Sequence, residues 1–289
     1  MKIGFIGAGK IGFSLGKYMK EGGVQVAGYY SRHTDSAKEA ARFTDTAYYE
    51  DIYMLIKDSD ALFITVPDGS IPQVFDGIKH AVNNKIICHC SGALTAAEAF
   101  AEEEKWGFFG YSIHPLFAVS NKYDSYRELP GVFFALEGNK KYLNEMKAML
   151  ESLGNPVAVI PAEKKRKYHL AAALASNYVI SLVSWSLDLM GECGFTEKEA
   201  LAALKPILIG NMEHLAECGP VESLTGPVER NDISTIEKHL GQLEEEDRLL
   251  YSLLSKKLLK TAKKKHEECD YRRLRELLKG KSEAQQKGE

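Results

Sequence analysis

Short apolar segments alternate with amphipathic segments over the first 160 residues of the chain. The apolar segments are rich in valine, isoleucine, phenylalanine and tyrosine, a composition typical of β-strands. We expect strands at residues 2–6, 24–30, 61–66, 85–89, 107–113, 132–135 and 157–160. Segments with helical periodicity lie between them, for example residues 11–20, 36–43 and 142–153. This alternation predicts an α/β domain with a doubly wound parallel sheet and helices on both faces.

The pattern changes after Pro161, where leucine, alanine, glutamate and lysine recur at helical spacing. The most apolar stretch, residues 168–190, predicts a buried helix. The segment Ser234-Thr235-Ile236-Glu237 matches a capping box and predicts a helix start there. We therefore expect an all-helical C-terminal domain. The predicted organisation is a domain at 1–160, a helical domain at 161–280 and a disordered tail at 281–289.

Composition and charge narrow the class of protein. A chain of 289 residues is long enough for two domains, and 45% hydrophobic with 27% charged residues is ordinary for a soluble protein. A net charge of −3 provides no electrostatic reason to expect nucleic acid as a partner. Met1 and Lys2 lead directly into a strand, so we expect no signal peptide. Polar residues within 168–190 argue against a membrane span.

Cysteine usage points to a reducing compartment. The chain has five cysteines, an odd number at irregular spacing, which favours free thiols and a cytoplasmic location. Cys88-His89-Cys90 is similar to one half of a metal site, but no second half with matching spacing exists. We expect no metal.

A glycine-rich turn follows the first predicted strand. Residues 7–12 read Gly7-Ala8-Gly9-Lys10-Ile11-Gly12, and a helical segment follows them. In this context Gly7 permits a tight turn, Gly9 lets the backbone approach a pyrophosphate, and Gly12 allows close packing of helix on strand. The helix N-terminus attracts phosphate. The N-terminal domain is therefore predicted to be a Rossmann domain that binds a dinucleotide.

The end of the second strand distinguishes between the two nicotinamide cofactors. NAD-binding domains place an acidic residue there to bind the ribose hydroxyls. This chain has Ser31 and Arg32 instead, and Asp35 comes too late, where it would cap the next helix. A hydroxyl followed by a guanidinium suits a 2′-phosphate. The sequence thus predicts NADPH as the cofactor.

Three further loops follow predicted strands, at the edge of the sheet where ligands bind in α/β domains. The first two loops are expected to flank the nicotinamide, and they contain Val66, Pro67 and Asp68, and Cys90, Ser91 and Gly92. The third contains His114, within Ser112-Ile113-His114-Pro115-Leu116-Phe117. His114 is a candidate substrate contact, and a histidine that only braces the loop is the alternative.

Three longer strings carry a family resemblance that covers nearly the whole chain. They are SIHPLF at 112–117, YHLAAALASN at 168–177 and GPVERNDISTIEKHL at 226–240. Together with the glycine-rich turn they resemble Rossmann-like proteins with the DUF2520 domain, within the 6-phosphogluconate dehydrogenase-like superfamily. The resemblance implies an NADP-dependent oxidoreductase, usually dimeric. It also implies similarity to an alternative type of ketopantoate reductase.

His169, Ala173 and Asn177 are spaced i, i+4, i+8 and form one ridge of the predicted helix. Ketopantoate reductases of the main type have lysine, asparagine and asparagine at positions that look equivalent. The resemblance therefore maps the general acid onto His169 and retains Asn177. A histidine titrates near neutrality and can protonate a developing alkoxide; a histidine hydrogen-bonded between helices is the alternative. Lys165, in a basic run, is the reserve candidate for the acid.

The loop at 226–232 precedes a predicted helix and carries Arg230, Asn231 and Asp232. Arg230 is a candidate for binding a substrate carboxylate, because a guanidinium binds a carboxylate in a bidentate manner. Asn231 and Asp232 are expected either to orient that substrate or to cap the following helix. Solvated charges are the alternative for all three.

These residues lead to one main functional prediction and two alternatives. The main one is an NADPH-dependent reductase of a small 2-oxo acid, most specifically ketopantoate to pantoate in pantothenate biosynthesis. The alternatives are an imine reductase of the pyrroline-5-carboxylate type and an NADPH-binding regulatory protein without catalysis. Helical second domains with small-residue faces commonly pair, so we expect a homodimer, with neither nucleic acid nor membrane as a partner.

Overall fold

The computed structural model describes residues 1–279, so the tail predicted at 281–289 lies outside the described residues. The chain divides into two compact units, Met1–Ser181 and Leu182–Glu289, which we describe separately. The N-terminal unit thus includes the helix that follows Pro161. Short 3-10 helices lie at Asp68–Ser70, Lys79–Ala81, Ser125–Glu128 and Ala162–Lys164.

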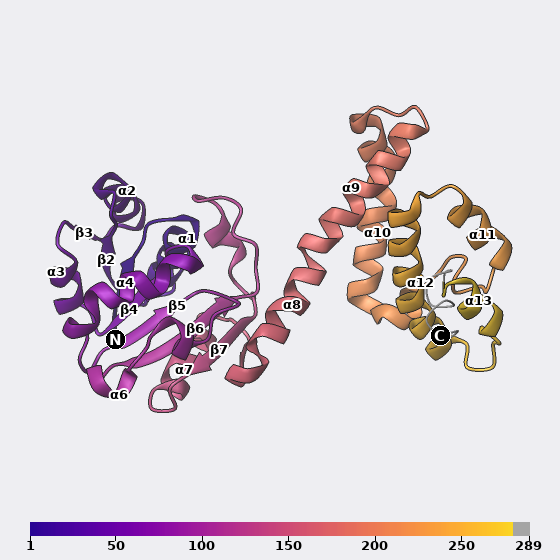
Figure 1. The fold of residues 1–289 in the computed structure, drawn as a ribbon. Coiled ribbons are helices and arrows are strands. Elements are labelled where there is room, and N and C mark those ends of the chain that lie inside the picture. The colour runs from indigo at the N-terminus through magenta and orange to yellow at the C-terminus, as the bar shows by residue number, and fades with distance from the viewer. Residues whose placement is uncertain (280–289) are drawn as a thin grey trace. The chain divides into compact units, whose positions relative to one another are not determined.

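The N-terminal unit is built on one eight-stranded sheet with the order β3-β2-β1-β4-β5-β6-β7-β8 (Figure 1). The strands are β1 Lys2–Ile6, β2 Gln25–Tyr30, β3 Ala47–Tyr49, β4 Ala61–Ile64, β5 Ile86–His89, β6 Phe109–Pro115, β7 Phe134–Gly138 and β8 Val157–Val159. Each of the seven predicted strands is present. β3 was not predicted from the sequence, because it has only three residues, of which two are exposed.

One pair in this sheet departs from the predicted parallel arrangement. β7 runs antiparallel to β6, whereas every other neighbouring pair is parallel. The connection between them, residues 116–133, contains one 3-10 helix and no α-helix that would return the chain to the opposite edge. The chain therefore re-enters the sheet from the edge where β6 ends.

Helices cover both faces of the sheet, which confirms the doubly wound α/β fold. One face packs against α1 Lys10–Glu21, α2 Thr34–Thr44 and α7 Leu143–Ser152. The other packs against α3 Ile52–Lys57, α4 Ile71–Ile78, α5 Ala96–Ala99 and α6 Glu103–Trp106. Successive residues of β4 point to opposite faces, so that Phe63 belongs to the first core and Ile64 to the second.

The expected single helix at 168–190 consists of two helices, α8 Lys165–Ala175 and α9 Asn177–Glu192. Ser176 separates them with φ −123° and ψ −79°. The expectation that this stretch is buried was wrong: none of the α9 residues is buried, and Ile180 is 70% exposed. The periodicity of the sequence predicted an apolar helix, but it gives no information about which part of the molecule covers that helix. Ala162–Glu192 is long and apolar enough to cross a membrane, a criterion that core helices of soluble proteins also meet.

The C-terminal unit is helical, as predicted. It contains the end of α9 together with α10 Glu197–Ser223, α11 Ile233–Gly241, α12 Glu245–Lys265 and α13 Arg272–Leu277. In Figure 1, α10 and α12 run side by side. A small core includes Ile236, Leu259 and Tyr271. The helix start predicted just after the 226–232 loop is confirmed, since α11 begins at Ile233. The predicted capping box at Ser234 was wrong, because Asp232 caps α11 by accepting a hydrogen bond from the Thr235 amide at 3.1 Å.

Candidate active site

The glycine-rich turn between β1 and α1 forms a cradle of backbone atoms. Gly7 has φ +111°, a conformation that favours glycine. A Cβ on Gly12 would lie 2.4 Å from the Gly7 carbonyl oxygen and 2.4 Å from Thr65 Oγ1, so only glycine fits there. Gly9 caps α1 without a side-chain hydrogen bond, and this leaves the amides of the first turn free for an anion. The cradle therefore suits the pyrophosphate of a dinucleotide.

The remaining residues of the turn and the end of β2 complete this side of the site. Ala8 is buried, Ile11 is half-buried and Lys10 is exposed. The Gly7 amide donates to the Tyr30 carbonyl at 2.8 Å, which brings the end of β2 beside the turn. Ser31 is half-buried there and Arg32 is exposed. Arg32 forms no ion pair with any residue of 1–279 in the structure, so its guanidinium is available to a 2′-phosphate.

The loops after β4 and β5 are joined to each other. The Ser91 hydroxyl donates to the Asp68 carboxylate at 2.6 Å and accepts from the Leu94 amide at 3.0 Å. The Ser91 amide donates to His89 Nδ1 at 3.1 Å. Val66 packs against the core, and Pro67 directly precedes the turn at Asp68. These bonds hold the two predicted nicotinamide loops in one arrangement.

Two groups beneath these loops are kept neutral by burial. Burial lowers the pKa of His89 to about 3, with a further contribution from the Lys165 charge. Burial also raises the pKa of the Cys90 thiol to about 12. Cys90 is therefore present as a thiol rather than as a nucleophilic thiolate. Residues 1–279 contain no cluster of three or more ligating side chains that would hold a metal ion.

A buried lysine lies behind the loops, at the start of α8. Lys165 is fully buried, and its Nζ donates to the Ser112 hydroxyl at 2.5 Å. Burial lowers its pKa to about 8, although the charge of nearby Glu137 opposes that shift. The Glu137 carboxylate is itself buried and accepts from the Ala96 amide at 2.8 Å. An ammonium has three N–H groups, and Ser112 is its one hydrogen-bond partner among the described residues.

From the sequence, Lys165 was only the reserve candidate for the general acid, because it is one of four consecutive basic residues. Its neighbours Lys164 and Lys167 are exposed, so one residue of the run faces inward. The spacing between Lys165 and His169 could have identified Lys165 as a residue of the site. Lys165 lies four residues before His169, and it therefore lies on the same ridge of α8, one helical turn earlier. The ridge that we predicted from His169 through Ala173 to Asn177 is interrupted at Ser176, so that Asn177 begins α9.

His114 and His169 meet over Gly92. Their ring centroids are 6.3 Å apart, and a Cβ on Gly92 would lie 2.6 Å from His169 Cδ2 and 2.8 Å from His114 Nε2. Nδ1 of His114 is 2.9 Å from the Tyr168 hydroxyl. Burial, with help from the charge of Lys165, lowers the pKa of His114 to about 4, so this imidazole is neutral at pH 7. Three separate segments thus bring polar groups together at the carboxyl edge of the sheet.

A cavity of about 540 Å³ opens beside these histidines. It is lined by His114, Leu116, Phe117 and Ala118, by residues of α8 that include Tyr168 and His169, and by Ser176 and Asn177 where α8 ends and α9 begins. His169 and Asn177 therefore line the same cavity. The lining contains neither a lysine nor an arginine.

The three candidates from the 226–232 loop belong to the C-terminal unit. Arg230 is exposed and lines a cavity of about 730 Å³ together with Glu229 and His266, which are 2.6 Å apart. Asn231 has φ +55°, and its Nδ2 donates to the Asp270 carbonyl at 3.1 Å. Asp232 is the α11 cap, and hydrogen bonds from Thr235 lower its pKa. Asp232 thus has a structural role, one of the two that we expected.

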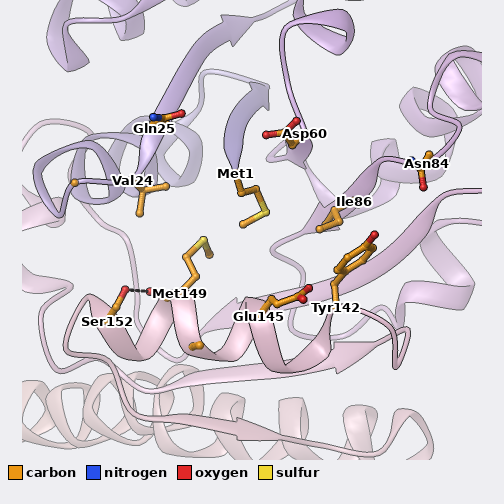
Figure 2. A pocket seen from close by; sticks show the side chains of 12 residues that line it. Met1, Val24, Gln25, Asp60, Asn84, Ile86, Tyr142, Glu145, Met149 and Ser152 are labelled. Carbon is orange, nitrogen blue, oxygen red and sulfur yellow. Dashed lines mark hydrogen bonds between the residues drawn. The ribbon is translucent and has the colours of Figure 1, made fainter.

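A further cavity, of about 900 Å³, lies at the opposite edge of the sheet. Figure 2 shows Met1 and Asp60 on one side of it, and Tyr142 with Glu145 and Met149 of α7 on the other. Met1 directly precedes β1 and Asp60 directly precedes β4, so the cavity lies at the edge of the sheet where these strands begin. It contains none of the histidine, lysine and glycine features described above, and we assign the site to the carboxyl edge.

Comparison with known proteins agrees with this geometry. Residues 2–91 match the family model described as NADP oxidoreductase, coenzyme F420-dependent, and residues 132–258 match the domain of unknown function DUF2520. The second match confirms the resemblance to DUF2520 proteins over that region. No curated protein matches the chain significantly.

Solved structures share the fold over most of the chain. Protein TM1727 from Thermotoga maritima has a TM-score of 0.71 at 27% identity, over 91% of this chain and 98% of that one. A putative NADP oxidoreductase, BF3122 from Bacteroides fragilis, has a TM-score of 0.70 at 21% identity, over 90% and 98%. A reductive aminase from Aspergillus terreus in complex with NADPH and ethyl levulinate has a TM-score of 0.64 at 14% identity, over 90% and 93%.

The fold, the cradle and the family models define the class of protein. It is an NADP-dependent oxidoreductase with an N-terminal Rossmann domain, and NADPH is its cofactor. The prediction of NADPH from Ser31 and Arg32 is confirmed at the level of the cofactor.

Proposed function

We propose that this oxidoreductase reduces the carbonyl group of a small 2-oxo acid, with ketopantoate as the first substrate to test. The observation that supports the proposal is the convergence of His114, His169 and the buried Lys165 at the nicotinamide loops. Bound NADPH supplies a hydride. The chain must then stabilise the negative charge that develops on the substrate oxygen and protonate it.

The chain's own groups divide these tasks. His169 lines the cavity and is the proposed proton donor. Neutral His114 is held through Nδ1 by Tyr168, which directs its other ring nitrogen towards the Gly92 loop, where it is available to a substrate oxygen. Lys165 is sealed from solvent, so we assign it an electrostatic role: its charge stabilises a nearby developing alkoxide. Substrate roles for Asn177, Arg230 and Asn231 stay predictions.

An NADPH-oxidation screen tests the proposal. The panel contains ketopantoate, short 2-oxo acids and pyrroline-5-carboxylate, with NADH as the cofactor control. Oxidation with 2-oxo acids supports carbonyl reduction, and oxidation with ketopantoate supports pantoate formation. Absence of oxidation with every 2-oxo acid overturns it. NADPH binding without turnover across the full panel would instead favour a regulatory protein.

Imine reduction is the second candidate, and one observation favours it. The 540 Å³ cavity is lined by histidine, tyrosine, serine, asparagine and apolar side chains, with no cation to bind a carboxylate, and this lining favours an imine that lacks a carboxylate. The reductive aminase of similar fold provides the precedent for C=N chemistry in such a fold. A protonated imine needs no strong acid, so activity on imines is expected to survive the loss of His169. Activity on 2-oxo acids is not expected to survive the loss of His169.

Arg32→Ala is expected to weaken NADPH binding by roughly 10- to 100-fold and to leave NADH binding unchanged. The reason is the loss of a charge-assisted contact to the 2′-phosphate, which NADH lacks. Titration of both cofactors by fluorescence measures the effect. Arg42→Ala, an exposed arginine at the end of α2, is the matched control. Equal weakening for NADH would show that Arg32 does not contact the 2′-phosphate.

We also propose that the protein is a cytoplasmic homodimer, with a second copy rather than lipid covering its exposed apolar helices. Leu170, Leu174, Tyr178 and Ile180 are between 53% and 70% exposed. Ile180→Glu is therefore expected to produce a monomer, because a charge cannot be buried unpaired in an apolar interface. Light scattering after gel filtration measures the mass. Glu192→Lys on the same helix is the control. A wild-type monomer, or a protein that needs detergent, contradicts this proposal.

A further inference from the structure

The connection between β6 and β7 reaches both the candidate substrate cavity and the cofactor helices. Its first residues, Leu116, Phe117 and Ala118, line the 540 Å³ cavity next to His114. A few residues later, Lys122 and Tyr123 contact α1 and α2. We call residues 116–125 the strap. Within the connection between β6 and β7, the strap is the segment that both lines the cavity and contacts α1 and α2.

The strap is attached to α2 through one carboxylate. Glu39 accepts hydrogen bonds from Lys122 Nζ and from the Tyr123 hydroxyl. These bonds hold the pKa of Glu39 below its usual range, so the carboxylate is ionised at neutral pH. Because exposed ion pairs are individually weak, the attachment depends on the several contacts acting together.

The strap is attached to Phe13 of α1 and to Phe43 of α2 mainly through aromatic contacts. The Tyr123 ring packs edge-on against Phe13 at 5.2 Å and against Phe43 at 5.5 Å between centroids. Lys122 Nζ lies 4.5 Å from the centroid of Phe13, a cation–π geometry. The Ser14 hydroxyl donates to the Lys122 carbonyl at 3.4 Å. Phe13 is fully buried, so the strap rests on the packed part of α1.

The strap is internally braced between its two ends. The Asn121 side chain accepts from the Tyr123 amide at 2.7 Å and from the Asp124 amide at 3.2 Å. The buried Ser125 hydroxyl accepts from the Asn121 amide at 3.0 Å. Residues 121–125 are thus held as one body, and two residues, Val119 and Ser120, separate that body from Ala118 in the cavity wall.

Both helices that the strap contacts begin at cofactor-binding residues. α1 starts at the glycine cradle, one turn before Phe13, and α2 follows Ser31 and Arg32 and carries Glu39. Phosphates bound at these N-termini fix the first turns of both helices. We propose that Glu39 and Tyr123 are positioning residues: through the strap they set the cavity wall at 116–118 when NADPH binds. The structural part of this inference needs only NADPH binding, and its kinetic part rests on the proposed function.

Hydrogen exchange on the full-length protein tests the structural part. In the wild type, NADPH is expected to slow exchange of amides in residues 113–120, which do not belong to the predicted cofactor loops. Tyr123→Ala is expected to abolish that slowing, and Glu39→Gln to reduce it. Arg127→Ala is the matched control, because the Arg127 side chain pairs with Asp124 and lies over the ring of Tyr126, both in the same connection. No slowing in the wild type, or equal slowing in Tyr123→Ala, overturns the inference.

Steady-state kinetics test the functional part. With the substrate that the screen identifies, Tyr123→Ala is expected to raise KM roughly five- to tenfold with kcat nearly unchanged. NADPH affinity is expected to change by less than about threefold, since neither residue contacts the cofactor. Glu39→Gln distinguishes lost coupling from misfolding, because it retains the aromatic packing. A fall in kcat alone contradicts the inference. A screen with no substrate leaves the exchange experiment intact and sinks only the proposed reaction.

Discussion

Lys165→Met is expected to lower kcat by at least about 100-fold and, at the same pH, to make the protein more stable. The activity falls because the variant lacks the buried charge that stabilises the developing alkoxide. The stability rises because an ammonium with a single hydrogen-bond partner is costly to bury, and methionine has a similar volume without charge. We expect a gain of about 1 to 3 kcal/mol in the free energy of unfolding at pH 7.

The pH dependence of stability identifies the same group. The folded pKa of Lys165 is about 8, below its ordinary value of 10.5. Between these pH values the unfolded chain holds a proton that the folded chain has lost, so this lysine makes stability rise with pH. Its contribution is complete above the unfolded pKa and is lost as the pH falls through about 8. Urea titrations at pH 7.5 and 9.5 measure it, and the rise should be smaller in Lys165→Met.

Lys167→Met is the matched control for both measurements. Lys167 is exposed on the same helix, so its loss should change neither kcat nor the unfolding midpoint. Wild-type kcat is also expected to decline above about pH 8, as Lys165 loses its charge. A Lys165→Met enzyme with normal kcat would show that the buried charge has no part in the reaction.

His169→Ala is expected to lower kcat on a 2-oxo acid by roughly 100- to 10,000-fold, the usual contribution of a positioned general acid. NADPH affinity should be nearly unchanged, since His169 lies with its ring edge beside the Gly92 loop and lines the candidate substrate cavity. Stopped-flow measurement of a single turnover separates this step from product release.

His214→Ala, at an exposed histidine of α10, is the control for His169→Ala. His169→Gln retains a hydrogen-bonding side chain without an acid, so it should be as slow as the alanine variant if proton transfer is the lost function. If both His169 variants retain normal kcat, His169 is not the acid. Activity retained on imines but lost on 2-oxo acids would favour the imine reductase.

The local elements and the cofactor half of the site were predictable from sequence. The spacing of glycines at positions 7, 9 and 12 is a local requirement of one turn, and Gly7 and Gly12 occupy positions that a side chain could not. The same is true of Ser31 and Arg32, whose place at the end of β2 follows from strand length alone. Such features depend on neighbours within one turn or strand, so a linear pattern contains them.

The residues that we propose for catalysis were predictable only as a set of candidates. Lys165 and Ser112 are 53 positions apart, and His114 and Tyr168 are 54 apart. No periodicity specifies which of four adjacent basic residues is turned inward, because that depends on how α8 packs against the loops of the sheet. The exposure of α9 and the antiparallel direction of β7 likewise depend on tertiary contacts, which no local pattern specifies.

The sequence by itself therefore determined most of the strands and helices, the Rossmann domain and the choice of NADPH, because short-range sterics and side-chain charge decide them. Only the tertiary structure decided that Lys165 is buried against Ser112, and that Gly92 lets His114 and His169 approach each other. The physical reason is that burial and long-range contact create the lowered pKa values of Lys165 and His114. Neither property belongs to a residue until the chain has folded around it.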